Sequence, residues 1–267
     1  MIIVICFILT NISSVNAENM LVVYDKDLNK VSQEKMKIVP DSMLSLGSNK
    51  LLISGALYYY QVQIPPAYKI LKSYITNNPL IIAGQLSSGE FIFYDRNGLY
   101  SYSQTGKKLK TISHRAFINS AILLPKDKIM LSVGFKELVS IDPNGKELWV
   151  KQIGISQLSI TDDNKILALN NSKKLLLDLD IYGNEIKKIP INDAPDSVYK
   201  IGSNKYFVVS RGREECGLYS LEKGIFLPVK KLTGLELFKS FVRLPSGLIL
   251  LGGSIIESNK FIPVNNN

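Results

Sequence analysis

The feature that most constrains the fold of this chain is a hairpin that recurs at nearly regular spacing. Its clearest copy is Ser140–Ile153, where two apolar runs flank the turn Asp142–Gly145 and include the chain's one tryptophan, Trp149. An Asn-Gly pair between apolar runs is a strong hairpin signal, because both residues adopt positive φ at little cost. A single hairpin cannot bury its own apolar face, so its recurrence predicts a fold built from packed repeats.

Two types of hairpin alternate along the chain. The first type has two apolar runs around a short polar turn, in Met43–Gly55, Ile81–Tyr94, Ala121–Val133, Leu158–Leu169, Val198–Ser210 and Phe241–Gly252. The second type follows it in Leu57–Tyr74, Leu99–Ile112, Leu138–Ile153, Leu175–Ile191 and Leu218–Leu232, and Leu21–Ile38 precedes them all. The turn glycines Gly106, Gly145, Gly183 and Gly224 are spaced 39, 38 and 41 residues apart. Four short strands in a repeat of about 40 residues are typical of a propeller blade.

Six hairpins of the first type predict an all-β fold, a β-propeller of six four-stranded blades. Leu21–Ile38 would complete the blade that Phe241–Gly252 begins, so that N- and C-terminal strands close the ring in one blade. Closure would remove the exposed edges of an open sheet. A seventh blade stays an alternative if Ile255–Val264 belongs to one. We expect residues 18–264 to form a single domain and residues 265–267 a disordered tail.

The stretch Ile141–Trp149, with its aspartate, turn glycine, basic residue and Leu-Trp pair, resembles the repeat of PQQ-like (quinoprotein-type) β-propellers. Tyr102–Lys110 is similar but lacks the tryptophan, and Leu179–Ile189 is a fainter match. The resemblance implies the propeller fold and no particular activity. The chain has no vicinal cysteine pair and no recognisable quinone-binding set, so we expect no cofactor.

The N-terminus has the pattern of an export signal. An apolar run, Ile2–Leu9, precedes small and polar residues and the cleavage-like sequence Val15-Asn16-Ala17. This predicts a signal peptide over residues 1–17 and export to the periplasm, the cell exterior or the cell surface. The run is too short for a membrane span, which needs about 20 apolar residues. No Lys or Arg precedes it, which leaves a first β-strand or a misplaced start codon as alternatives.

The mature chain would keep one cysteine, Cys216. A single cysteine can form no disulfide within the chain. It would pair between chains, stay a free thiol, or lie buried as a small apolar side chain.

The formal net charge of +9 favours anionic partners or surfaces. In a propeller, the loops within a blade between its second and third strands share one face with the loops between blades, and we call this the loop face. The candidate ligand-binding residues fall on such loops: Arg96, His114, Arg115, Arg211 and Arg213. The planar arginine fork matches carboxylate, phosphate and sulfate groups bidentately. We therefore expect a protein or anionic ligand on the loop face, with solvated charge or internal ion pairs as the alternative.

Lysines instead crowd the other face and the rim. The turn Asp142–Gly145 is predicted to lie there, away from the arginine loops, with Trp149 packed between blades. Tyr58–Tyr60 is the main aromatic concentration. Tyrosines are common on strands, and exposed phenol groups would also suit contact with a carbohydrate or a protein.

Catalytic and metal-binding motifs are scarce. His114 is the only histidine, so no multi-histidine metal site can form. Asp25, Asp27 and Asn29 have calcium-loop spacing, but the glycine and the closing glutamate of such a loop are missing, so we expect no metal.

We expect an exported, non-catalytic binding module. The alternative is an exported hydrolase or lyase that uses His114 with Glu214, Asp193 or Asp196. Nucleic-acid binding is not expected, because the lysines are not interleaved with aromatic residues and export argues against it.

Overall fold

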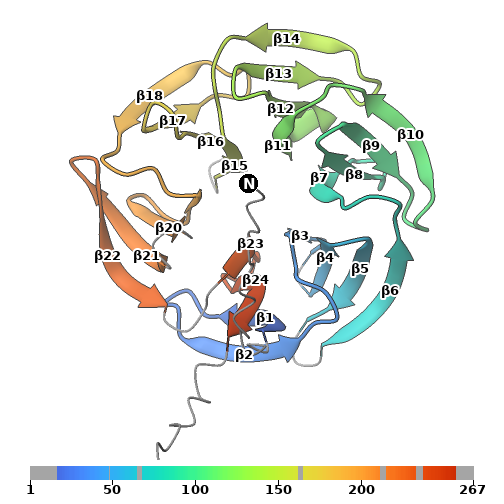
Figure 1. Cartoon of the computed structure of the whole chain (residues 1–267), viewed down its shortest axis with the longest axis horizontal. Coiled ribbons are helices and arrows are strands. Elements are labelled where there is room, and N and C mark those ends of the chain that lie inside the picture. Colours follow the sequence, from blue (N-terminus) through green and yellow to red (C-terminus); the bar gives the residue numbers. More distant parts are fainter. Residues whose placement is uncertain are drawn as a thin grey trace, which may run out of the picture.

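The structure is a computed structural model that describes residues 17–47, 49–64, 68–161, 165–210, 215–232 and 237–256. These residues form six four-stranded antiparallel sheets arranged as a closed ring (Figure 1). Blades 1 to 5 are β3–β6, β7–β10, β11–β14, β15–β18 and β19–β22, and blade 6 combines β23 and β24 with β1 and β2. The prediction of a six-bladed propeller is confirmed. Residues 1–16, which hold most of the predicted signal peptide, and the 265–267 tail lie outside the described residues.

Each blade runs from a strand at the centre of the ring to a strand at its circumference. The innermost strands are β3 (Ser42–Ser45), β7 (Ile81–Gln85), β11 (Ile118–Leu123), β15 (Gln157–Ile160), β19 (Ser197–Lys200) and β23 (Leu237–Arg243). The second strands are β4 (Lys50–Gly55), β8 (Phe91–Asp95), β12 (Ile129–Val133), β16 (Ile166–Asn170), β20 (Lys205–Ser210) and β24 (Ile249–Ile256). The third strands are β5 (Tyr58–Gln63), β9 (Gly98–Tyr102), β13 (Glu137–Ile141), β17 (Leu175–Leu179), β21 (Glu215–Glu222) and β1 (Ala17–Tyr24). The outer strands are β6 (Lys69–Ile75), β10 (Lys108–Ser113), β14 (Glu147–Lys151), β18 (Glu185–Pro190), β22 (Ile225–Leu232) and β2 (Lys30–Lys35).

Strand β1 closes the ring, as the sequence predicted. It pairs antiparallel with β24 from Ala17 opposite Ile256 to Tyr24 opposite Ile249. Side chains alternate across a strand, so β1 contributes to two cores at once. Met20, Val22 and Tyr24 pack against blade 5, and the residues between them, Leu21 and Val23, pack against blade 1.

The apolar core is divided into six clusters, one between each pair of neighbouring blades. Cys216 of β21 is buried in the cluster between blades 5 and 6, at 4% exposure. Burial raises the pKa of its thiol to about 12, so the group stays protonated at neutral pH. Of the alternatives for this cysteine, the structure shows the buried thiol. The tyrosine concentration is also mostly core, because Tyr59 and Tyr60 are buried.

The outer strands run around the circumference of the ring (Figure 1), because strand twist accumulates across four strands. At the junctions of blade 2 with blade 3 and of blade 3 with blade 4, the end of one outer strand therefore reaches the turn that precedes the next outer strand. A Cβ atom on Gly183 would lie 2.5 Å from the ring of Trp149, which confirms that this tryptophan packs between blades. A Cβ atom on Gly145 would lie 2.1 Å from the carbonyl oxygen of Ile112, next to the loop that carries Arg115. The prediction that this turn lies away from the arginine loops is wrong.

Among the described residues, three lysine–asparagine hydrogen bonds link an outer strand to a turn of the next blade. In each, a lysine Nζ from an outer strand donates to the side-chain oxygen of an asparagine in the next blade's turn. The pairs are Lys110 with Asn144 (3.1 Å), Lys151 with Asn184 (2.6 Å) and Lys230 with Asn29 (2.8 Å). Part of the lysine-rich rim thus serves to link blades.

Candidate functional site

Two neighbouring loops of the loop face bring three of the predicted site residues together. Arg96 lies in the turn between β8 and β9, and His114 and Arg115 lie in the loop between β10 and β11. The backbone N–H of Phe117, in that second loop, donates to the carbonyl oxygen of Arg96 at 2.6 Å. These residues therefore form one surface at the junction of blades 2 and 3.

The other two predicted residues, Arg211 and Arg213, lie outside the described residues. Ser210 and Glu215, which flank them, belong to blade 5. Blade 5 lies across the ring from blade 2 (Figure 1). The structure thus brings three of the five predicted residues together and does not describe the other two.

Arg115 is held by two carboxylates. Its Nη1 lies 2.9 Å from Oε2 of Glu137, and its Nη2 lies 2.5 Å from Oε1 of Glu147. The hydrogen bond with Glu147 is the main reason that the pKa of Arg115 is raised above its ordinary value. The side chain therefore ties the loop between β10 and β11 to both β13 and β14. Arg96 and His114 are exposed to solvent.

The structure adds two residues that the sequence analysis missed, Phe117 and Phe135. Their exposed fractions are 69% and 62%. The N–H of Gly134 donates to the carbonyl oxygen of Phe117 at 2.9 Å, so the two phenylalanines sit on adjoining turns. Together with Arg96 and His114, they give this part of the loop face a mixed aromatic and basic surface.

Both phenylalanines have a left-handed backbone, with φ of +61° at Phe117 and +55° at Phe135. Gly134 and Phe135 are the central residues of a four-residue turn, which the N–H of Lys136 closes onto the carbonyl oxygen of Val133 at 3.1 Å. Glycine or asparagine normally fills such positions. A Gly-Phe pair at this turn was the sequence signal that could have drawn attention to Phe135.

The acidic groups near this surface are engaged within the fold. Oδ1 of Asp95 accepts hydrogen bonds from the backbone N–H of Asn97 at 2.7 Å and of Gly98 at 3.0 Å. Glu137 and Glu147 are paired with Arg115, as described above. In the described part of the chain, no ion pair joins Arg96 or Lys136 to an acidic group. Arg96 and Lys136 are therefore exposed cations that no carboxylate pairs, while Asp95, Glu137 and Glu147 keep their negative charge nearby.

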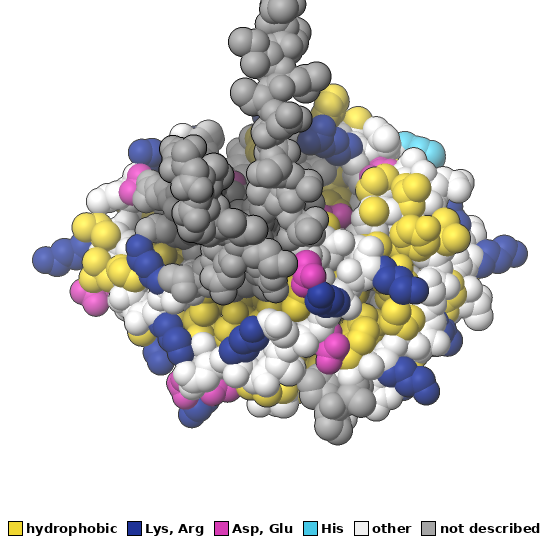
Figure 2. Space-filling model, turned by 60° about the horizontal axis from the view of Figure 1, so that its bottom comes forward, with side chains coloured by type: hydrophobic (Ala, Val, Ile, Leu, Met, Phe, Trp, Pro, Cys, Tyr) yellow, Lys and Arg dark blue, Asp and Glu magenta, His cyan; other side chains and the backbone are white. Residues whose placement is uncertain are grey.

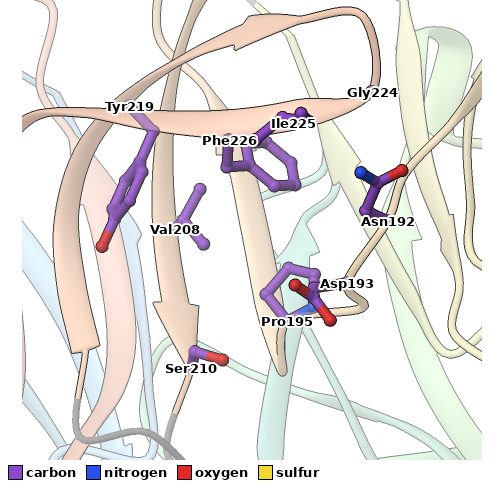
Figure 3. Close-up of a pocket in the computed structure, with 9 residues that line it drawn as sticks. All are labelled: Asn192, Asp193, Pro195, Val208, Ser210, Tyr219, Gly224, Ile225 and Phe226. Atoms are coloured by element: carbon purple, nitrogen blue, oxygen red, sulfur yellow. The ribbon is translucent and has the colours of Figure 1, made fainter.

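A small pocket lies elsewhere, beside blade 5, with a volume of about 80 Å³. Figure 3 shows Val208 and Phe226 facing Asp193 and Pro195 across it. Asp193 and Asp196 belong to the loop between β18 and β19, two blade-to-blade connections further along the ring from His114. The described structure thus places these carboxylates and His114 on different loops, and Glu214 lies outside it.

The described residues contain no group of three or more His, Cys, Asp or Glu side chains placed to hold a metal ion. Nor do they include a helix long and apolar enough to cross a membrane. Asp25, in the segment with calcium-loop spacing, accepts hydrogen bonds from the backbone N–H of Asp27 and Asn29 and so shapes its own turn. Figure 2 shows basic side chains spread over the visible face, several of them beside acidic ones.

Comparison with solved structures shows similarity in fold. A protein of unknown function from Bacteroides caccae has a TM-score of 0.56 at 12% identity, over 80% of this chain and 93% of that one. The WD40 domain of Neurospora crassa Pan2 has a TM-score of 0.54 at 13% identity, over 81% and 89%. A streptogramin B lyase has a TM-score of 0.52 at 10% identity, over 84% and 77%.

No protein-family model and no curated protein matches the sequence. The resemblance to PQQ-like propellers is thus supported as far as the β-propeller fold. At identities of 10 to 13%, the structural matches show the fold alone.

Proposed function

We propose that this chain is an exported, non-catalytic binding module that holds a protein or anionic ligand on its loop face. The β-propeller is a scaffold often used for binding, and a rigid ring displays its loops in fixed positions. The observation that carries the proposal is the contact between the Arg96 turn and the His114–Phe117 loop. It gathers exposed basic groups from two loops onto one surface, in a chain with a net charge of +9.

Arg115 supports this surface from within. Its bonds to Glu137 and Glu147 fix the loop that presents His114, while Arg96 stays exposed. A ligand carboxylate or phosphate that contacts Arg96 would form a charge-assisted hydrogen bond, which is roughly twice as strong as a neutral one.

The binding proposal is tested by charge removal at Arg96. Wild-type protein and the Arg96→Gln variant are immobilised and exposed to the extracellular fraction of the producing cells. Lys72→Gln, an exposed change of equal charge on β6, is the matched control. We expect Arg96→Gln to retain at least fivefold less of a specific component than the wild type or Lys72→Gln. Equal retention by all three proteins contradicts the proposal.

The export proposal has its own measurement, the mass of the protein recovered outside the cell. Cleavage after Ala17 gives a mature chain that begins at Glu18. A full-length chain that is found only inside the cell contradicts export.

A further inference from the structure

We propose that the surface formed by Phe117 and Phe135, with Arg96 and Lys136 beside them, docks an acidic segment of a protein partner that carries apolar side chains beside its carboxylates. We call this surface the phenylalanine platform. The inference rests on the proposed function and names the chemistry of its ligand.

The two phenylalanine rings of the platform are exposed to solvent. The fold has interior places for phenylalanine, since Phe91, Phe93 and Phe207 are almost completely buried. Phe117 and Phe135 instead remain 69% and 62% exposed on adjoining turns. A phenylalanine side chain gains about 1.5–3 kcal/mol when it is buried. Single exposed apolar side chains are ordinary, but two on hydrogen-bonded neighbouring turns make a surface that a partner can cover.

Both rings also stand on a strained backbone. Phe117 and Phe135 both have positive φ, where a side chain other than that of glycine costs roughly 1–2 kcal/mol. Six other described non-glycine residues share this conformation, Lys174 and Lys223 among them, so it marks a cost and not by itself a site. Neither ring is buried enough to offset that cost by packing within the chain. A ligand that covers both rings supplies the missing contact.

Backbone contacts hold the two turns of the platform in place before any ligand binds. The N–H of Phe117 bonds to the carbonyl oxygen of Arg96, and the carbonyl oxygen of Phe117 accepts from the N–H of Gly134. On the other side, the carbonyl oxygen of Phe135 lies against Gly154, where a Cβ atom would come within 2.3 Å of it. Loops that are fixed before binding lose little conformational entropy when a partner arrives.

Charge selects the partner. Asp95 turns its Oδ1 toward backbone N–H groups, and Glu137 and Glu147 share Arg115, although all three carboxylates keep their negative charge. Arg96 and Lys136 are exposed cations in these turns, and among the described residues neither forms an ion pair. A small inorganic anion would contact these cations and leave the rings uncovered. An acidic segment with apolar side chains meets both features, as aromatic and arginine anchors do in protein interfaces.

The test uses a display library of random dodecapeptides, selected on the intact wild-type chain. We expect the selected peptides to combine Asp or Glu with apolar residues. Their affinity should fall at least tenfold for the double variant Phe117→Asn/Phe135→Asn. Asparagine tolerates left-handed backbone, so the melting temperature of this variant should equal or exceed that of the wild type.

The control for a lost aromatic side chain is Tyr182→Asn, at an exposed tyrosine in the turn before β18. This variant should bind the selected peptides as the wild type does. In a second arm, Arg96→Glu/Lys136→Glu should lose at least tenfold in affinity, and versions of the peptides with Lys in place of Asp and Glu should recover it.

Four outcomes would overturn the inference: a library that yields no binder, selected peptides that are basic, peptides that bind the double asparagine variant as tightly as the wild type, or a lower melting temperature for that variant. The last result would give the rings a structural role. The two proposals can also fail separately. If Arg96→Gln lowers retention of the extracellular component at least fivefold but the double asparagine variant retains it fully, the proposed function stands and this inference fails.

Discussion

Gly145 and Gly247 have nearly the same backbone conformation in different surroundings. Their φ angles are +87° and +85°. A Cβ atom on Gly145 would lie 2.1 Å from the carbonyl oxygen of Ile112 in the preceding blade, whereas a Cβ atom on Gly247 would have no neighbour within 4 Å. Comparing alanine substitutions at the two glycines therefore separates the cost of a left-handed backbone from the cost of crowding a junction between blades.

We predict that Gly145→Ala destabilises the protein by about 1–3 kcal/mol more than Gly247→Ala. Both variants acquire the same backbone strain, but only the first forces atoms into the junction between blades 2 and 3. The midpoints of urea unfolding measure the difference. Equal losses would show that the turn moves away from Ile112 at little cost.

Leu28 has a backbone conformation that its residue type does not predict. Leu28 lies in the β1–β2 turn and has a φ of +57°. The equivalent position in three other blades is a glycine: Gly106, Gly145 and Gly183. The side chain of Leu28 is 2% exposed in the cluster between blades 5 and 6. A leucine in a left-handed position is rare, so turn propensity alone does not predict it. The apolar packing of its side chain between blades 5 and 6 offsets the cost of this backbone conformation.

At the scale of loops and strands, Arg115 acts as a brace. The sequence placed it among candidate ligand contacts, and internal ion pairs were the alternative. In the structure, its guanidinium joins the loop that holds Phe117 to Glu137, two residues beyond Phe135. Glu137 and Glu147 belong to β13 and β14. How closely their carboxylates approach the Arg115 guanidinium depends on the twist of blade 3.

We predict that Arg115→Gln speeds hydrogen exchange at the N–H groups of Phe117 and Gly134, because the two turns lose their charged link. Global stability should change by no more than about 1 kcal/mol, since the pairs are partly exposed. Exchange measured by mass spectrometry checks this, with Lys151→Gln as a matched control in another junction. Unchanged exchange at both amides would contradict the brace.

At the scale of the whole molecule, β1 decides whether the ring is closed. It pairs along its full length with β24 and packs into two inter-blade cores. We predict that a chain beginning at Asp25 loses cooperative unfolding and aggregates, because β24 then exposes an unpaired edge. A chain beginning at Glu18 should unfold cooperatively and should not aggregate. Light scattering and thermal unfolding measure both, and equal behaviour would contradict this role.

The candidate site was predictable only in part. Loop order placed Arg96, His114 and Arg115 on one face, and the structure brings their loops into contact. The sequence did not single out Phe117 or Phe135, because an aromatic residue in a short loop reads equally well as the start of a strand. Their exposure depends on how loops from two blades meet.

The repeat of apolar runs and turn residues determined by itself the all-β class, the six blades and the closure by both ends of the chain, because each of these follows from local pattern and its period. Only the tertiary structure decided which turn meets which strand. Twist carries the outer strands around the ring, so the Asp142–Gly145 turn lies beside the Arg115 loop. This contact results from small rotations that add up over the four strands of a blade, and no local sequence pattern predicts it.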